Sequence, residues 1–540
     1  MAGKRTLQRT LISSYVYLTR RLGGLLSHHR RSSNHPSFQK TFSLISQEKH
    51  AGRGRSQAVV CRVEGGLLRS PSTFPYFMLV ALEAGGFLRG LLLLLLYPCL
   101  CCVGEEVGLK VMAMVCFRGV KVAGFRVGST VLPKHLLEDV GLEGFQLLTA
   151  AGGKKVCVTG MPRVMVEAAL KEYLGVEVVV GRELKVSGGY YTGFMENSKE
   201  EERMLQELGG EEGDHGDGES VLWVGGGKEA HHHHPFFSER KEEYTVSEED
   251  RKAWRPLPRD KYLKPLVFHD GRIAFLPTPA ATLAMFLWLP VGLLLAVLRL
   301  LVLSLLPYKI SVPILAFTGT TNRVVRSAFT PVTSDRGGES QGRPRRRWLF
   351  ACNHRTLLDP VYVSGALGIP LTVVTYSLSP VSEVIAPIKT VRLTREREED
   401  RRRMEEELRR GDVVVCPEGT TCREPYLLRF SPLFSEVAEE GVTPVALRAR
   451  MAMFYGTTAG GRKWMDPIFF AIDPFPSYTV EFLREVPVLE ADGTRRSRYE
   501  VANQVQAELA AALGFECTTL TRKDKYMQLA GNEGFVDRKS

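Results

Sequence analysis

The sequence lacks any regular spacing of its cysteines, although ten are present among 540 residues. Disulfide-rich secreted proteins depend on such spacing, so we predict no disulfide framework and a reducing compartment. Four consecutive histidines stand at 231–234, but adjacent side chains diverge and no second cluster of ligand residues accompanies them. We therefore predict no metal site.

Acidic residues are missing from the first 47 positions, which contain eight lysines and arginines. This composition is typical of a mitochondrial transit peptide, and equally of a plain basic extension. No cleavable secretory apolar region is visible there. Residues 1–55 are therefore interpreted as a basic extension or targeting segment. We favour a membrane location at the endoplasmic reticulum, with the mitochondrion as the alternative that this segment permits.

Long apolar runs are scarce. Residues 282–306 contain a single charge, Arg299, over 25 positions, which is long enough to cross a bilayer. The run predicts a membrane segment, either one tilted span or a re-entrant pair broken at Pro290. A second run, residues 91–103, is too short to cross alone and is interpreted as a buried helix or an interfacial segment.

The chain is too long for one compact core, so we expect two or three domains. Its net charge of +11 favours a negatively charged partner: nucleic acid, anionic lipid or a phosphorylated substrate. We expect no nucleic acid, because the positive charge is concentrated in the extension and linkers and no aromatic-basic motif accompanies it. The apolar run instead indicates a lipid bilayer.

Two blocks of the chain alternate strand and helix patterns, which predicts an α/β fold. The first block begins near residue 58 and indicates a parallel sheet. The second begins at Trp348, where LFACNH, LTVVTYS, VVVCPEG and TPVALRAR each read as a strand. The predicted organisation is a basic extension (1–55), an α/β domain (56–245), a connector (246–279), a membrane segment (280–307), a basic linker (308–347), a second α/β domain (348–490) and a helical tail (491–540).

A histidine and a carboxylate stand close together in the second block, at His354 and Asp359. Five residues on a helix correspond to about 140° of rotation, so the histidine must lie in a loop before the helix. Pro360 suits the first helical position, which makes Asp359 a natural N-cap. The functional alternative is that Asp359 orients the imidazole as a general base. The pair alone leaves both interpretations open.

A second constellation follows the apolar run at 413–416. The turn Pro-Glu-Gly-Thr at 417–420 offers backbone N–H groups, and Gly419 permits close approach to them. Arg423 can pair with a phosphate in bidentate fashion. Between the two motifs, Arg392 and Arg395 are expected on one side of a strand, where either could extend an anion site. An ordinary turn with a surface arginine is the alternative.

Four motifs in this order resemble the PlsC-type glycerolipid acyltransferase family: the pair His354 and Asp359, an arginine at Arg395 or Arg392, the Pro-Glu-Gly-Thr turn, and Pro444 within an apolar strand. The wording VCPEGTTCREPYLLRFS and the tail GFECTTLTRKDKY are similar to the land-plant glycerol-3-phosphate acyltransferases of extracellular-lipid synthesis. The resemblance covers residues 58–531. Thr421-Cys422 departs from it, because many relatives carry Arg-Ser there.

The resemblance implies a membrane enzyme with acyl-CoA as donor and glycerol 3-phosphate as acceptor, acylated at the sn-2 hydroxyl to give lysophosphatidic acid for cutin, suberin or related lipids. His354 would take the hydroxyl proton and Asp359 would orient it. No cofactor is implied, since the thioester is already activated. The implied substrate-binding residues are Arg392, Arg395, Glu418, Gly419, Thr420 and Arg423.

The same resemblance implies an N-terminal domain of the haloacid-dehalogenase (HAD) type, which removes phosphate in active relatives. That chemistry needs an Asp-x-Asp-Gly-Thr loop, with the first aspartate as nucleophile. Here the loop reads Arg62-Val63-Glu64-Gly65-Gly66, and Thr159 matches the hydroxyl motif. We predict a folded but phosphatase-inactive domain. The alternatives are a bifunctional enzyme that releases 2-monoacylglycerol, and a non-catalytic membrane scaffold.

Overall fold

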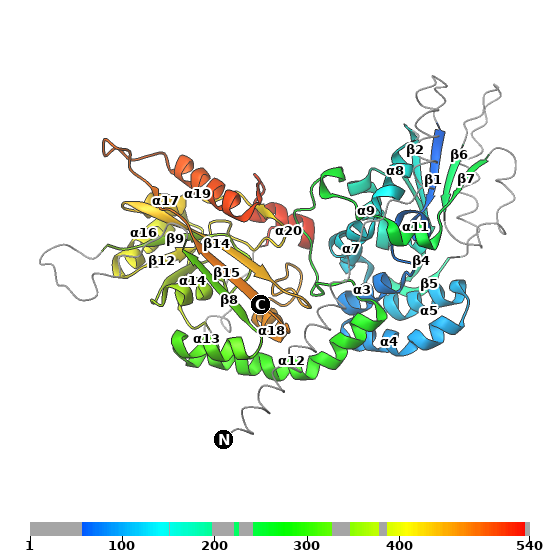
Figure 1. Ribbon diagram of the computed structural model, residues 1–540, viewed down its shortest axis with the longest axis horizontal. Helices are drawn as coiled ribbons and strands as arrows, with labels where there is room; N and C mark the ends of the chain where they lie inside the picture. The colour runs from blue at the N-terminus through cyan, green and yellow to red at the C-terminus, as the bar shows by residue number, and fades with distance from the viewer. Residues whose placement is uncertain are drawn as a thin grey trace, which may run out of the picture.

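The computed structural model describes residues 57–150, 152–196, 221–225, 241–326, 346–376 and 386–534. Two α/β domains lie side by side, and one long helix runs along the lower side of both (Figure 1). The predicted basic extension at 1–55 and the histidines at 231–234 lie outside the described residues, as do residues 327–345 of the linker before Trp348.

The N-terminal domain contains a five-stranded sheet in the order β3-β2-β1-β6-β7, and every neighbouring pair is parallel. The predicted parallel sheet is therefore confirmed. Its strands are β1 (Gln57–Arg62), β2 (Gly152–Pro162), β3 (Val178–Arg182), β6 (Val221–Gly225) and β7 (Lys241–Thr245). The surrounding elements are α3 (Phe74–Gly85), α4 (Phe87–Cys102), α5 (Glu105–Phe117), α6 (Val127–Thr130), α7 (Leu132–Asp139), α8 (Leu142–Ala150), α9 (Arg163–Leu174), the hairpin β4 (Leu184–Ser187) and β5 (Tyr190–Met195), and α11 (Glu248–Ala253).

The C-terminal domain is built on a mainly parallel sheet in the order β11-β10-β12-β9-β14-β15-β8. Its strands are β8 (Thr321–Arg326), β9 (Leu349–Cys352), β10 (Thr372–Thr375), β11 (Lys389–Arg392), β12 (Val413–Val415), β14 (Gly441–Arg450) and β15 (Ser477–Phe482), with β16 (Val486–Pro487) beside β14. The helices are α14 (Asp359–Leu367), α16 (Arg397–Arg410), α17 (Leu433–Val437), α18 (Asp466–Ile472), α19 (Arg498–Leu513) and α20 (Arg522–Ala530), and a short pair joins β13 (Tyr426–Leu427) to β17 (Glu516–Cys517).

The four strands expected after residue 348 all form, as β9, β10, β12 and β14. Strand β9 shows why they read as continuous apolar runs. Leu349 and Ala351 face one hydrophobic core, while Phe350 and Cys352 face a second core across the sheet. Both faces are covered, so every residue of the strand is buried.

The domain boundary at 348 departs from the prediction. Helix α13 (Tyr308–Phe317) and strand β8 fall within the predicted basic linker, and β8 pairs in parallel with β15. The acyltransferase-like sheet therefore includes chain that precedes the long linker. Polar and charged residues dominate β8, which lies at the sheet edge with most side chains exposed, so no apolar run marks it in the sequence.

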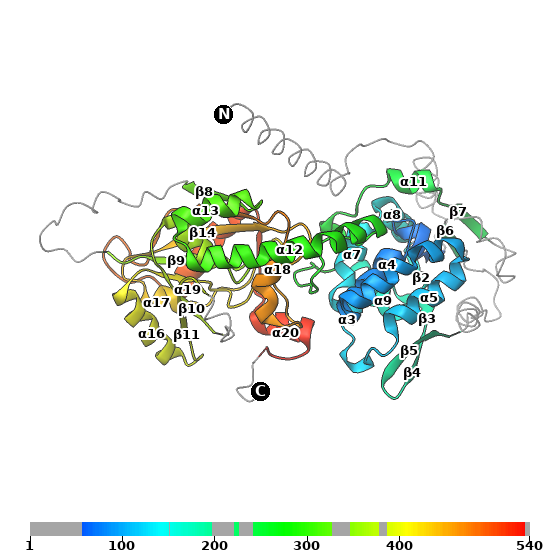
Figure 2. The same cartoon turned by 90° about the horizontal axis from the view of Figure 1, so that it is seen from below.

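Helix α12 (Pro279–Leu305) is continuous through Pro290, so the re-entrant interpretation is wrong. Among the described residues it is the one helix long and apolar enough to cross a membrane. One side packs against α18 (Figure 2). Arg299 stabilises the contact between α12 and α18, because its buried guanidinium donates to the carbonyls of Ala471 at 2.7 Å and Asp473 at 2.6 Å. The second apolar run belongs to α4, which Gly86 separates from the buried α3.

The connector at 246–279 joins the two domains through ion pairs. Arg272 contacts Asp466 of α18 at 2.5 Å, while its backbone N–H donates to Glu83 of α3 at 2.6 Å. Nearby, Glu424 binds both Arg259 at 2.5 Å and His269 at 2.8 Å. The N-terminal domain is thereby linked to the loop that follows the Pro-Glu-Gly-Thr turn.

Candidate active site

Asn353 ends β9 and fixes where the histidine is presented. Its side-chain amide donates to the Leu447 carbonyl at 3.0 Å and its oxygen accepts from the Leu447 N–H at 2.7 Å. These two side-chain hydrogen bonds continue the pairing of β9 with β14 one residue beyond the end of β9. The chain then turns away from the sheet, and His354 stands at the carboxyl end of β9.

The carboxylate of Asp359 is completely buried and organises the loop between β9 and α14. It accepts hydrogen bonds from His354 Nδ1 at 2.9 Å, from the Arg355 N–H at 2.5 Å and from the Thr356 N–H at 3.0 Å. The hydroxyl of Tyr478 on β15 also donates to it. The predicted N-cap role is wrong in detail. Helix α14 begins at Asp359, and the carboxylate binds N–H groups of the preceding loop instead of the helix.

Cys416 and Asp359 both affect the pKa of the histidine. Burial alone would lower the pKa of His354, but the neighbouring Cys416 sulfur and the Asp359 carboxylate outweigh it and raise that pKa above its ordinary value. With Nδ1 held by Asp359, Nε2 is the ring nitrogen that can accept a proton. This is the arrangement of a base and its orienting carboxylate.

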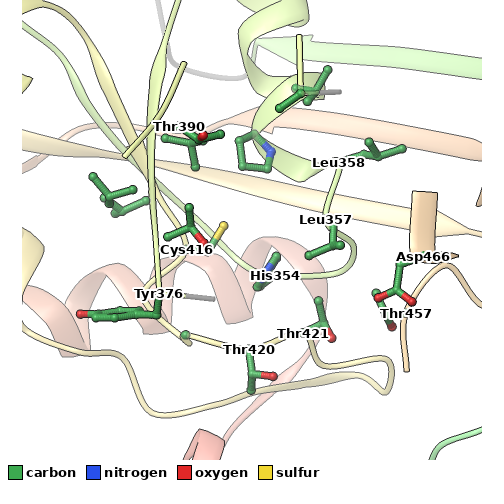
Figure 3. Close-up of a pocket in the computed structure, with 18 of the residues that line it drawn as sticks. His354, Leu357, Leu358, Tyr376, Thr390, Cys416, Thr420, Thr421, Thr457 and Asp466 are labelled. Atoms are coloured by element: carbon green, nitrogen blue, oxygen red, sulfur yellow. The ribbon is translucent and has the colours of Figure 1, made fainter. Parts of the chain in front are cut away.

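His354 borders a cavity of about 310 Å³ (Figure 3). Its lining combines many apolar side chains with hydroxyl and charged groups, among them those of Thr420, Thr421, Thr457 and Asp466, which Figure 3 shows around the histidine. Gly419 and Thr420 of the predicted site both line it. The apolar side chains of the lining include Leu300, Leu303, Leu357, Val361, Val373, Ile388, Met404, Leu433 and Phe434.

Glu418 lies behind the cavity wall and is not one of its lining residues. Its buried carboxylate accepts from the His354 N–H at 2.7 Å and from the Leu428 N–H at 3.0 Å. Burial raises the pKa of Glu418 to about 7, against the lowering effect of these two bonds. In this geometry Glu418 holds the backbone of the histidine, and the substrate contact expected of it stays a prediction.

The two arginines near β11 do not share one side of a strand, so that expectation is wrong. Strand β11 ends at Arg392, whose side chain is exposed. Arg395 follows outside the strand with a φ of 74°, and within the described chain it is the one residue other than glycine with positive φ. Its N–H donates to Asp400 at 2.9 Å. Its guanidinium lies 5.9 Å from the ring centre of Tyr376, which borders the cavity.

Arg423 points into the connector. Its buried guanidinium donates to the Gly271 carbonyl at 2.9 Å, lies 3.5 Å from Asp270 and covers the Tyr455 ring at 4.3 Å. It is absent from the cavity lining. A phosphate contact by Arg423 is therefore not made by this arrangement, and its role in substrate binding stays untested.

In the N-terminal domain, the loop at residues 62–66, which replaces the Asp-x-Asp-Gly-Thr sequence of active relatives, forms contacts with neighbouring parts of its own domain. Arg62 ends β1 and contacts Glu105 at 3.4 Å. Glu64 accepts from the Thr159 hydroxyl at 2.5 Å and from the N–H groups of Gly160 at 3.4 Å and Met161 at 3.3 Å. A carboxylate thus occupies the donors that could hold an anion. Within the described ranges no group of three or more potential ligands is arranged to hold a metal ion.

Sequence reasoning missed several residues that support the site. Tyr478 comes from a strand 119 positions after Asp359, in an alternating pattern that any half-buried strand shows. Lys525 is buried under the Pro-Glu-Gly-Thr turn, where its ammonium donates to the Thr421 carbonyl at 2.5 Å. Lys525 belongs to α20, whose sequence is rich in charged residues, so nothing in the sequence indicated that this lysine is buried. Cys416 followed a strand and read as one more apolar residue.

The fold and the site define a PlsC-type glycerolipid acyltransferase joined to a HAD-like domain. Residues 58–246 match the family model described as "Glycerol-3-phosphate acyltransferase RAM2-like, HAD-like domain", and residues 336–447 match that of the acyltransferases.

The chain belongs to the plant glycerol-3-phosphate acyltransferase family, and the resemblance inferred from its motifs is confirmed. It is 50% identical to "Probable glycerol-3-phosphate acyltransferase 2" of Arabidopsis thaliana, over 90% of this chain and 91% of that protein. It is 47% identical to "Probable glycerol-3-phosphate acyltransferase 3" of the same plant, over 98% and 99%. It is 41% identical to "Glycerol-3-phosphate acyltransferase RAM2" of Petunia hybrida, over 88% and 98%. The protein is a glycerol-3-phosphate acyltransferase.

Replacing Asp359→Asn should lower kcat by about 100-fold or more and move the acidic limb of the pH profile to lower pH. With His354 as the base, the limb would mark the pKa below which its ring is protonated and cannot accept a proton. Asp359 raises that pKa, so removing its charge lowers it. The measurement is kcat/KM against pH. Asp492→Asn, in an exposed turn, serves as the control. An unmoved limb in the Asp359 variant would contradict the pairing.

Replacing Glu418→Gln should lower kcat by about ten-fold, because the amide cannot accept from both N–H groups that the carboxylate binds. The KM for glycerol 3-phosphate should change less, since the carboxylate faces His354 and Leu428. Steady-state kinetics with the exposed Glu490→Gln as control separates the two effects. A rise in that KM with kcat preserved would instead place Glu418 in contact with the substrate.

Proposed function

We propose that this enzyme transfers the acyl group of acyl-CoA to the sn-2 hydroxyl of glycerol 3-phosphate, with His354 as general base, and releases lysophosphatidic acid. The observation that carries the mechanism is the pairing of His354 with a buried Asp359 beside a cavity lined by apolar and hydroxyl-bearing side chains. The apolar side chains suit an acyl chain, and the hydroxyl groups suit a polar acceptor. The sn-2 position and a role in cutin, suberin or related lipids follow the family resemblance.

The reaction needs two proton transfers, one to His354 and one from it. His354 Nε2 accepts the proton of the acceptor hydroxyl while the oxygen attacks the thioester carbonyl carbon. The carbon–sulfur bond then breaks, and the departing CoA sulfur takes the proton back from the imidazolium. Asp359 stabilises the imidazolium and holds the ring in place throughout.

We propose further that the product keeps its phosphate. Two features of the N-terminal domain support this. Arg62 stands where a nucleophilic aspartate is required and pairs with Glu105. Glu64 already occupies the hydroxyl of Thr159 and the adjacent N–H groups, and its negative charge would repel a phosphate there. The alternative, a bifunctional enzyme that releases 2-monoacylglycerol, lacks both the nucleophile and an open anion site.

The purified enzyme should convert glycerol 3-phosphate labelled in both carbon and phosphorus into a lipid that retains both labels in their starting ratio. The same assay on His354→Ala should show transfer reduced by about 100-fold or more. Positional analysis before acyl migration should place the acyl group at sn-2. Carbon-labelled monoacylglycerol as the main product would overturn phosphate retention, and full activity of the His354 variant would overturn the mechanism.

We propose that the enzyme works at a bilayer surface, of the endoplasmic reticulum or alternatively of the mitochondrion. The side of α12 away from α18 is apolar and exposed, with Leu294 75% exposed. Leu88 on α4 and Phe317 on α13 are 84% and 86% exposed, and Figure 2 shows all three helices on the face turned toward the viewer. Because its other side packs on the protein, α12 is proposed to enter the bilayer through this face.

Replacing Leu287→Glu and Leu294→Glu together should release the enzyme from phosphatidylcholine vesicles, since each charge in the apolar layer costs about 3 kcal/mol. The bound fraction in vesicle sedimentation should fall at least about ten-fold. Tyr499→Glu, exposed on α19 at the opposite side of the domain in Figure 1, is the matched control. Equal binding of both variants would contradict the proposed membrane face.

A further inference from the structure

Two cationic side chains beside the cavity, Lys463 and Arg522, belong to none of the four acyltransferase motifs. Lys463 lies between β14 and α18, and Arg522 is the first residue of α20 in the C-terminal tail. Both residues line the cavity that His354 borders. Both side chains contact Tyr526. The Lys463 ammonium donates to the Tyr526 hydroxyl at 2.6 Å, and the Arg522 guanidinium lies 4.8 Å from the centre of the same ring. Both side chains are partly exposed, so a ligand can reach them.

Helix α20 is firmly joined to the motif loop. One residue before Tyr526, the buried Lys525 ammonium donates to the Thr421 carbonyl at 2.5 Å and lies 3.1 Å from the Thr421 hydroxyl and 3.3 Å from that of Thr420. The tail therefore sets Arg522 at a fixed place beside the Pro-Glu-Gly-Thr turn, and the carbonyls of Glu533 and Gly534 accept hydrogen bonds from its guanidinium.

The surroundings of this pair are positive. Among the lining residues Asp466 is the one carboxylate, and Arg272 already binds it at 2.5 Å. Burial tends to raise the pKa of Tyr526, yet the nearby Lys525 and Lys463 charges lower it overall. Burial, and then the charge of Arg395, lower the pKa of Arg522, so these two arginines lie near one another. An anion entering the cavity beside this pair would relieve the repulsion.

We propose that Lys463 and Arg522 bind a phosphate group of the substrate, with the hydroxyls of Thr420 and Thr421 beside it. Arginine and lysine at a site rich in hydroxyl donors are suited to a phosphate monoester. The phosphate comes either from glycerol 3-phosphate or from CoA. This inference deepens the proposed function and rests on it, because it assigns a headgroup site to the cavity of His354.

Arg522→Gln and Lys463→Gln should each raise the KM for one phosphorylated substrate by about ten-fold, which is the usual effect of losing a charge-assisted hydrogen bond. The full-length enzyme is assayed with glycerol 3-phosphate varied at saturating acyl-CoA, and then the reverse. A rise for the acceptor alone assigns the phosphate to glycerol 3-phosphate, and a rise for the donor alone assigns it to CoA. Lys523→Gln is the matched control, since Lys523 pairs with Glu533 on the exposed side of α20.

Calorimetric titration with glycerol 3-phosphate alone, and then with CoA alone, measures the binding affinity of the site in the absence of catalysis. Binding should weaken in the Gln variants, persist in Lys523→Gln and be partly regained in Arg522→Lys. Unchanged KM values and unchanged binding in folded Gln variants would overturn the proposal. Because titration needs no acyl transfer, weakened binding in these variants supports the site even if His354→Ala proves active, so failure of the base mechanism is seen separately.

Discussion

The active site depends on one buried charge. Asp359 has no exposed surface, and a carboxylate in such a place is tolerated only if hydrogen bonds surround it. Its donors come from the loop after β9, which includes the His354 ring, and from Tyr478 on β15. Satisfying the charge therefore draws two separate pieces of chain together. The geometry of the His354–Asp359 pair is a consequence of that requirement, because any loop that left the carboxylate unpaired would destabilise the fold.

A second chain of contacts connects this loop to the N-terminal domain. The Arg355 guanidinium, next to His354, donates to the carbonyls of Cys422 at 2.7 Å and Glu424 at 2.9 Å. The Glu424 side chain then binds Arg259 and His269 of the connector. Burial lowers the pKa of His269 to about 4, so it is neutral at neutral pH, and the pKa of Glu424 stays below its usual range despite burial because its partners favour the charged form. A domain with a filled catalytic loop thus remains attached to the working one through specific contacts.

Much of the fold followed from local patterns in the sequence. The β-branched runs predicted β9, β10, β12 and β14, because strands covered on both faces leave continuous apolar signals. Strand β8 could not be found this way, since it is polar and lies at the sheet edge. The pairing of His354 with Asp359 was one of two interpretations of a short loop. The structure shows the contact itself and places the carboxylate against N–H groups of the loop before α14, not against those of the helix. Tyr478, which also donates to this carboxylate, comes from a distant strand and could not be found from the loop sequence.

The direction of side chains at turns was the harder problem. Glu418 and Arg423 flank the same turn and have the charges expected of a substrate site, yet one faces the His354 backbone and the other the connector. A turn fixes where the backbone goes, but tertiary partners decide which way each side chain points. Arg423 pairs with Asp270 and donates to the Gly271 carbonyl. Both partners lie about 150 positions earlier in the chain, in a segment that carries none of the acyltransferase motifs.

Regiospecificity becomes a question of distance under the proposed arrangement. His354 is fixed by Asp359, and the proposed phosphate site is fixed by α20 through Lys525. The sn-2 oxygen of glycerol 3-phosphate is one carbon closer to its phosphate than the sn-1 oxygen. If the bound phosphate is that of glycerol 3-phosphate, we propose that these two fixed points admit one of the hydroxyls to His354 and leave the other out of reach. The choice would then depend on how far the tail helix holds its cations from the histidine, and would need no motif of its own.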